Sequence, residues 1–287
     1  MEYLIGQAKT LIEALPYIKS FFGHTIVIKY GGAAMVNEEL KGSFALNVVL
    51  LKYVGMKPVI IHGGGPQITS IMDRMGKEAK FIAGQRVTDE ETIEIVEMVL
   101  AGKINKEIVS LVNQAGARAV GLSGVDGRLI EAKRYIPSSG EDMGWVGDIT
   151  RINPKIIEIM DEQDFIPVIA SLGVGEDEHR FNINADLTAG EIAAALNALK
   201  LIILTDCRGI LADGHNEETL VSTLNIQEAE ELIAKGIISG GMIPKIRACQ
   251  IALCGGTEKT HIIDGRILNS IILELFTDEG IGTQITR

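Results

Sequence analysis

The chain has 287 residues, of which 46% are apolar, and a formal net charge of −11. This length and apolar content are enough for a large buried core. No uncharged apolar run of about 18 residues occurs, and the start carries an acidic residue, so neither a membrane span nor a cleavable leader is expected. The expected lack of a span and a leader favours a cytoplasmic protein, and the acidic balance, without a block of basic residues, argues against nucleic acid and anionic membranes as partners.

The first 22 residues predict a helix that precedes the folded core. Apolar residues recur at helical spacing, and Pro16 should kink or interrupt the helix. The apolar positions are Leu4, Ala8, Leu11, Ile12, Leu15 and Ile18. Two interpretations stay open: a helix packed on its own domain, or an arm that buries its apolar stripe against another subunit. We divide the chain accordingly into an extension, 1–24, and one folded domain, 25–287.

Short branched-aliphatic runs then alternate with helical segments, which predicts a doubly wound α/β sheet. The predicted strands are 25–29, 58–62, 118–122, 166–170, 200–205 and 260–263. Thr88 to Glu91 has capping-box spacing and predicts the start of a helix. Residues 128–151 read as a hairpin that leaves the sheet and could cover a site. The glycines at 173 and 175 suggest a hinge between two lobes.

Two of these strands run directly into glycines, at Gly31-Gly32 and at Gly63-Gly64-Gly65. Glycines between a strand and a helix let backbone N–H groups approach an anion closely, and the helix N-terminus adds positive potential. Lys29 at the end of the first strand could bridge phosphate oxygens held by the same glycines. Two such cradles indicate two anionic reactants, and hence phosphoryl transfer.

The second half adds polar residues at a helix start and at a strand end. Asn182, Asn184 and Asp186 precede the alanine-rich helical stretch 187–199, with Asp186 placed as its N-cap and the two asparagines able to contact a small ligand. The strand 200–205 ends in Thr205, Asp206 and a glycine, Gly209, at the sheet edge where open α/β folds bind ligands. Gly241, Met242 and Lys245 belong to a third glycine loop, which opens a helix.

Three cysteines, Cys207, Cys249 and Cys254, lack the paired spacing of a zinc site and are expected to be reduced thiols with no assigned chemistry.

Walker-type and protein-kinase motifs do not occur in the sequence. The motifs that do occur resemble the amino-acid kinase family over nearly the whole chain, and most closely its arginine-sensitive branch that phosphorylates N-acetyl-L-glutamate. They are Val27-Ile-Lys29-Tyr-Gly-Gly32, Ile61-His-Gly-Gly-Gly65-Pro66, Gly84-Gln-Arg86-Val-Thr88, Asn182-Ile-Asn-Ala-Asp186, Leu204-Thr-Asp206 and Gly241-Met-Ile-Pro-Lys245.

The resemblance implies a three-layer αβα sandwich with a mostly parallel central sheet, and two lobes around a cleft. Residues 25–173 would bind the amino-acid substrate and 174–287 the nucleotide. The implied reaction moves the γ-phosphoryl group of ATP to the side-chain carboxylate of N-acetyl-L-glutamate, a step of arginine biosynthesis. Magnesium would arrive with ATP, held by phosphates and water rather than by a protein cage.

The resemblance also assigns roles to residues. The catalytic candidates are Lys29, Lys245, Asp186, Gly32 and Gly64, with Asp186 orienting both lysines. The substrate would contact Gly64, Gly65, Arg86 and Asn182, and the Arg86 fork suits an α-carboxylate. The nucleotide candidates are Lys29, Gly31, Gly32, Thr205, Asp206, Gly209, Gly241, Met242 and Lys245.

The N-terminal helix resembles that of family members that form hexamers, as trimers of dimers, and that L-arginine inhibits. Arginine contacts are therefore expected at Tyr17, Lys200, His261, Glu274 and Gly280, although His261 could equally be an ordinary packed imidazole. Two other functions stay open: a kinase for an aminoadipate-type carboxylate, and a catalytically silent amino-acid sensor or scaffold that docks a PII signal protein. The intact Lys29, Asp186 and Lys245 argue against a silent protein.

Overall fold

A computed structural model of the chain describes residues 1–138, 140–214 and 216–287. The central feature is one eight-stranded sheet with the strand order β12-β14-β13-β11-β1-β2-β8-β5. Only the pairing of β13 with β14 is antiparallel, so the sheet is mostly parallel. Its strands are β1 (Thr25–Tyr30), β2 (Lys57–His62), β5 (Ala119–Ser123), β8 (Ile166–Ala170), β11 (Lys200–Thr205), β12 (Thr223–Asn225), β13 (Lys259–Asp264) and β14 (Thr283–Thr286).

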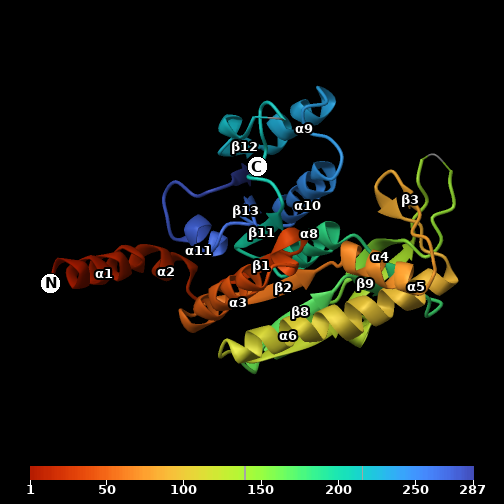
Figure 1. Cartoon of the computed structure of the whole chain (residues 1–287), viewed down its shortest axis with the longest axis horizontal. Helices are drawn as coiled ribbons and strands as arrows, with labels where there is room; N and C mark the ends of the chain where they lie inside the picture. Colours follow the sequence, from red (N-terminus) through yellow and green to blue (C-terminus); the bar gives the residue numbers. More distant parts are fainter. Residues whose placement is uncertain (139, 215) are drawn as a thin grey trace.

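Helices cover both faces of this sheet (Figure 1). Alternate strand residues point to opposite faces, and each face has its own apolar core. Ile28, Ile60 and Ile202 belong to one core, while Val27 and Ile203 belong to the other. The first core includes residues of α3 (Glu38–Tyr53), α4 (Gly65–Arg74), α5 (Glu90–Glu97), α6 (Asn105–Gln114) and α11 (Ser270–Leu275); the second includes α7 (Lys155–Glu162), α8 (Ala185–Ala195), α9 (Ile226–Ala234) and α10 (Met242–Cys254). The predicted three-layer sandwich is confirmed.

All six predicted strands are present, displaced by at most one residue at either end. Strands buried on both faces appear in a sequence as continuous apolar runs, which is why they could be recognised. The predicted hairpin is also present, as β6 (Ile130–Arg134) and β7 (Gly147–Ile152). These two strands belong to a second sheet with β9 (Leu172–Val174) and β10 (Arg180–Asn182), in the order β10-β9-β6-β7. A third, two-stranded sheet pairs β3 (Phe81–Ile82) with β4 (Gln85–Arg86).

Two local predictions need correction. Thr88 does not cap the helix after it; Asp89 is the N-cap of α5 and accepts a hydrogen bond from the backbone N–H of Thr92. The segment expected to be a hinge is part of a hairpin, because β9 (Leu172–Val174) pairs antiparallel with β10 (Arg180–Asn182). The interlobe boundary at residue 173 therefore falls within a paired strand.

The N-terminal segment forms two helices, α1 (Glu2–Glu13) and α2 (Leu15–Phe21), and the interruption expected from Pro16 lies at Ala14. These helices extend away from the body of the molecule (Figure 1). α2 packs on the body through Tyr17 and Phe21, whose rings contact Phe276 at centroid distances of 6.3 and 6.4 Å. No helix among the described residues is long and apolar enough to cross a membrane.

Candidate active site

The parallel strands bring their carboxyl ends to one edge of the sheet, at the point where the chain switches direction. β1 lies between β2 and β11, so the chain leaves β1 toward one side and later returns on the other. Ligands bind in the crevice at such a switch point. The glycines after β1 and β2 and the Asp206 segment after β11 all lie at this edge.

Three charged side chains meet at this edge. Lys29 Nζ lies 3.0 Å from Asp186 Oδ1, and Lys245 Nζ lies 2.8 Å from Asp186 Oδ2. They come from β1, α8 and α10, and none of the three side chains is more than 14% exposed. Burial tends to raise the pKa of the Asp186 carboxyl, but Lys29 and Lys245 outweigh it and hold that pKa below its usual value. The trio is therefore two ammonium groups around one carboxylate, which leaves one net positive charge.

The start of α8 places Asp186, but not in the way predicted from the sequence. Asn184 is the N-cap, and its side chain accepts from the backbone N–H groups of Asp186, at 2.9 Å, and Leu187, at 3.1 Å. The prediction that Asp186 is the cap is wrong, because Asn184 already satisfies those donors. Asp186 lies in the first turn, so its carboxylate is free to bind the two lysines.

Three of the glycines at this edge lie too close to neighbouring side chains to carry a Cβ without a shift. A Cβ on Gly31 would lie 2.7 Å from Lys29 Nζ, and a Cβ on Gly32, whose φ is +69°, would overlap the Asp206 carboxylate. A Cβ on Gly64 would overlap Ile104 and lie 2.9 Å from Leu100. The backbone here can thus approach an anion at positions that any side chain would block.

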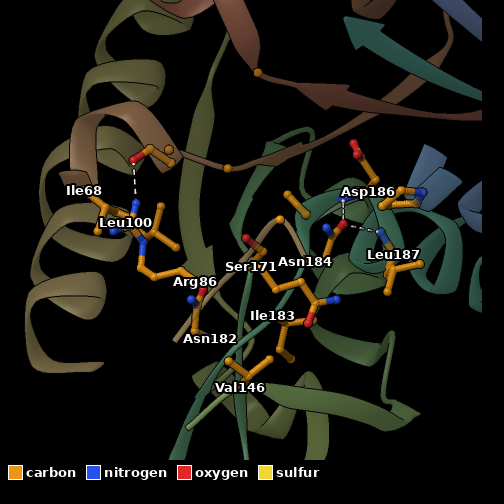
Figure 2. A pocket seen from close by; sticks show the side chains of 18 of the residues that line it. Ile68, Arg86, Leu100, Val146, Ser171, Asn182, Ile183, Asn184, Asp186 and Leu187 are labelled. Atoms are coloured by element: carbon orange, nitrogen blue, oxygen red, sulfur yellow. Dashed lines mark hydrogen bonds between the residues drawn. The ribbon is translucent and has the colours of Figure 1, made fainter. Parts of the chain in front are cut away.

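Arg86 lies at the other end of the site, as Figure 2 shows, across from Asp186 and beside Leu100 and Ile68. Its guanidinium donates to Gly65 O at 3.0 Å and to Thr69 Oγ1 at 2.6 Å, and burial lowers its pKa. No carboxylate lies within 4.0 Å of it among the described residues. A buried cation without a paired anion is costly, so this end of the site favours an anionic ligand.

Asn182 is fixed beside Arg86 by two hydrogen bonds. Its amide Nδ2 donates to Thr88 Oγ1 at 3.1 Å, and its backbone N–H donates to Trp145 O at 2.8 Å. A cavity of about 530 Å³ connects the two ends of the site. The predicted residues that line it are Lys29, Gly31, Gly32, Gly64, Gly65, Arg86, Asn182 and Asp186. Lys245 is joined to this cavity through Asp186, while Ile243 and Pro244 of the same segment line it directly.

The nucleotide candidates are divided between two places. Gly209 and Met242 line a second cavity of about 500 Å³, together with residues 210–214 and 236–239. Thr205 ends β11, Asp206 faces Gly32, and Gly241 is the N-cap residue of α10. The structure therefore places these candidates around the same sheet edge as the charged trio, but not in a single cavity.

Sequence reasoning missed several residues of the first cavity. Tyr135, Val146 and Asp148 reach it from the β6–β7 hairpin, and Ser171 and Gln85 also line it. Burial raises the pKa of the Asp148 carboxyl, with Lys133 opposing that effect. The available signal was the hairpin itself, which was expected to cover a site without identifying its side chains.

The five candidate arginine contacts lie together around a separate cavity of about 470 Å³. Lys200 Nζ lies 3.0 Å from His261 Nε2, and the opposite ring nitrogen lies 2.6 Å from Glu274 Oε1. Glu274 also accepts the backbone N–H groups of Ile281 and Gly282, and Tyr17 donates to Asp278 at 2.5 Å. Gly280 completes the set at a positive φ of +64°.

Comparison with known proteins finds relatives that align with this chain over nearly its full length. The model of the amino acid kinase family matches residues 24–264. The acetylglutamate kinase of Moorella thermoacetica is 57% identical over 282 residues, covering 96% of this chain and 95% of that protein. The acetylglutamate kinase of Heliobacterium modesticaldum is 52% identical over 291 residues, covering 99% of both.

Solved structures show the same fold. N-acetylglutamate synthase from Neisseria gonorrhoeae, complexed with coenzyme A and N-acetyl-glutamate, superposes with a TM-score of 0.86 at 27% identity over 98% of this chain. The same synthase complexed with coenzyme A and L-arginine gives 0.80 at 28% identity over 97%. This chain spans only 63% and 65% of those two synthase chains. Carbamate kinase from Giardia lamblia bound to AMP-PNP, at 19% identity over 92% of this chain and 98% of that one, gives 0.66 and shares the fold. The chain belongs to the amino acid kinase family and, within it, to the acetylglutamate kinases.

Proposed function

We propose that this chain transfers the γ-phosphoryl group of ATP to the side-chain carboxylate of N-acetyl-L-glutamate, giving an acyl phosphate for arginine biosynthesis. The observation that carries the proposal is one cavity with Lys29 and Asp186 at one end and, at the other, Arg86, which has no carboxylate partner among the described residues. A substrate with two carboxylates fits both ends at once. The relatives that align over nearly the full length are acetylglutamate kinases, which supports the same substrate.

Such a reaction needs no general base, because a glutamate-type carboxylate with an ordinary pKa of about 4.3 is already ionised at neutral pH. Catalysis then consists of positioning and of stabilising charge. Lys29 and Lys245 would neutralise the phosphoryl oxygens as the two anions approach, and Asp186 keeps the lysines from repelling each other. The N–H groups near Gly32 and Gly64 would hold the transferring group.

Magnesium would be held by the nucleotide rather than by the protein. Among the described residues, no group of three or more His, Cys, Asp or Glu side chains converges to hold a metal ion, and Asp186 is engaged by two lysines. A phosphate-bound Mg²⁺ fits these surroundings and would reduce the negative charge of the nucleotide. The lobes 25–173 and 174–287 would bind the amino-acid substrate and ATP respectively.

The deciding experiment traps the acyl phosphate formed from N-acetyl-L-glutamate and MgATP as its hydroxamate, with Lys29→Ala as the matched control. Hydroxamate from the wild type that is lost in the variant supports the proposal. Acyl phosphate formed only with an N-acetyl-aminoadipate substrate would replace it with the longer-chain kinase. Folded wild type that phosphorylates neither substrate would leave the silent sensor or PII-docking scaffold, and binding of a PII protein would then be measured.

We also propose that L-arginine binds the cavity around Lys200, His261 and Glu274 and inhibits the enzyme. Carboxylates of Glu258, Glu274 and Asp278 line it for a guanidinium. Two lysines, Lys200 and Lys259, line it for the α-carboxylate. The arginine-bound synthase of the same fold supports a site for this ligand in the family.

A further inference from the structure

The strand that precedes the Gly63–Gly65 loop ends in a fully buried histidine, His62, that the proposed mechanism does not use. Its Nδ1 lies 3.0 Å from Gly63 O, and its Nε2 lies 3.2 Å from Asn105 Nδ2. A carbonyl oxygen only accepts, so Nδ1 carries the proton and Nε2 accepts from the Asn105 amide. Burial lowers the pKa of His62 to about 4, with Lys106 adding to the effect and the bond to Gly63 opposing it, so the ring is neutral at physiological pH.

Asn105 is equally buried and its orientation is fixed from the other side. Lys106 Nζ donates to Asn105 Oδ1 at 3.0 Å, so the Nδ2 end must face His62. The same Nδ2 donates to Val168 O at 2.8 Å and Leu122 O at 3.2 Å, on two strands of the sheet. Asn105 thus connects β5, β8 and the end of β2 at one point.

An irregular helix brings Asn105 to this position. α5 and α6 are continuous through a π-helical segment, η2 (Met98–Ile104), and Asn105 is the next residue. Single π turns inside α-helices widen the turn and change which residues share a face, and they occur frequently at functional sites. The same segment presents Leu100 and Ile104 to Gly64, where a Cβ would overlap Ile104.

We propose that the π-helical segment, through Asn105–His62 on one side and Leu100 and Ile104 on the other, positions the Gly63–Gly65 loop for phosphoryl transfer. His62 and Asn105 are positioning residues, since neither lines the cavity. The loop is held at its start through Gly63 and packed at Gly64, while Gly65 O is held separately by Arg86. The inference rests on the proposed kinase function and adds residues to its machinery.

Gly121 offers a test that changes no hydrogen-bonding group. A Cβ there would overlap Asn105 Oδ1 and lie 2.5 Å from Lys106 Nζ, so Gly121→Ala should push Asn105 away from His62. Its control is Gly42→Ala in α3, outside the π-helical segment, where a Cβ meets nothing within 4 Å. Asn105→Leu removes the link directly, and its control is Asn47→Leu, a buried asparagine that bonds Ser43 O and Asn269 instead.

Displacement of a positioned group by about 1 Å can lower turnover roughly 100-fold, so Gly121→Ala and Asn105→Leu should lower kcat by about 10- to 100-fold. The KM for N-acetyl-L-glutamate should stay within about threefold, because Arg86 keeps its bond to Thr69 Oγ1, which lies outside the loop. The two controls should keep wild-type kcat even where they lower Tm. A loss confined to Tm, equal in Asn105→Leu and Asn47→Leu, would overturn the inference.

His62→Gln keeps the test decisive if the larger changes prevent folding. Its amide oxygen can accept from Asn105 but it loses the bond to Gly63, so kcat should fall between the wild type and Asn105→Leu. Wild-type kcat in His62→Gln would contradict the positioning role. A wild-type chain that forms no acyl phosphate would instead contradict the proposed function, so the two failures are distinguishable.

Discussion

Arg86 indicates an anionic ligand because it is buried without a carboxylate partner among the described residues. It is 7% exposed, yet its hydrogen bonds among the described residues go to a carbonyl, a hydroxyl and a thioether, with the Phe81 ring 4.8 Å away. Neutral partners offset only part of the cost of burying a charge. A carboxylate that displaces a neutral partner such as Thr69 Oγ1 from Nη2 can make two parallel bonds with the planar fork.

Arg86→Lys should therefore raise the KM for N-acetyl-L-glutamate by about 10- to 100-fold, since a single ammonium cannot reproduce the bidentate bond. The KM for ATP should stay unchanged, because the nucleotide candidates lie at the other end of the site. Steady-state kinetics with each substrate varied will measure both, with exposed Arg118→Lys as the control. An equal rise in both KM values would contradict the assignment of Arg86 to the amino-acid substrate.

Lys200 gives a prediction about pH. Burial lowers the pKa of its ammonium to about 8, with Lys259 adding to this effect and Glu274 and Glu258 opposing it. An unfolded lysine keeps its proton to about pH 10.4, so the unfolded chain binds more protons between these values. The free energy of unfolding attributable to Lys200 should therefore rise with pH across that window.

Lys200→Met should remove this contribution. Thermal unfolding of both proteins from pH 7 to 10.5 should show the wild type gaining stability relative to the variant above about pH 8. Parallel curves across the window would show that Lys200 titrates normally.

At the scale of elements, the start of α8 both stabilises a helix and places a catalytic candidate. Asn184→Ala should lower the free energy of unfolding by about 1 kcal/mol through the lost cap. It should also lower kcat, because Asp186 is in the first turn that Asn184 fixes. Asn225→Ala, at the capping box that begins α9, is a matched control that should lose similar stability and keep kcat. Equal kcat in the two variants would show that the Asn184 cap does not contribute to catalysis.

The elements also show which parts of the fold the sequence could predict. Buried parallel strands were recognisable because their apolar runs are local, and the glycine loops because they follow those strands directly. Caps were less certain, since Asn184 and Asp186 are both good N-caps and only the position of the two lysines distinguishes them. The His62–Asn105 link was not predictable, because it joins residues 43 positions apart. The π-helical segment was not predicted from the sequence either. The arginine cluster came from family resemblance alone.

At the scale of the whole molecule, α1 has apolar side chains that nothing in the described chain covers. Leu4, Leu11 and Ile12 are 59%, 75% and 68% exposed, although they lie at helical spacing. Such a stripe on an extended helix is typical of a contact with another subunit, which fits the hexamer expected from the family resemblance.

Deleting residues 1–13 removes α1 and keeps Tyr17 and Phe21, so its effect is confined to assembly. We expect the variant to form smaller oligomers by sedimentation, with kcat in the absence of arginine unchanged. Inhibition by arginine should weaken if the assembly supports it. A variant with wild-type mass and wild-type inhibition would show that α1 packs on its own domain or has no role in either property.

One strand connects the two proposed ligand sites. β11 begins at Lys200 in the arginine cavity and ends at Thr205, next to Asp206, which faces Gly32; its six residues span roughly 17 Å. All six are buried, and hydrogen bonds to β1 and β13 hold it on both sides. Because β11 is hydrogen-bonded along both sides, it cannot shift along its own axis without its neighbours. A displacement at Lys200 would therefore reach Thr205 through a tilt of the sheet as a whole. Inhibition by this route would change the angle between the two halves of the molecule and leave the hydrogen bonds at both ends of β11 intact.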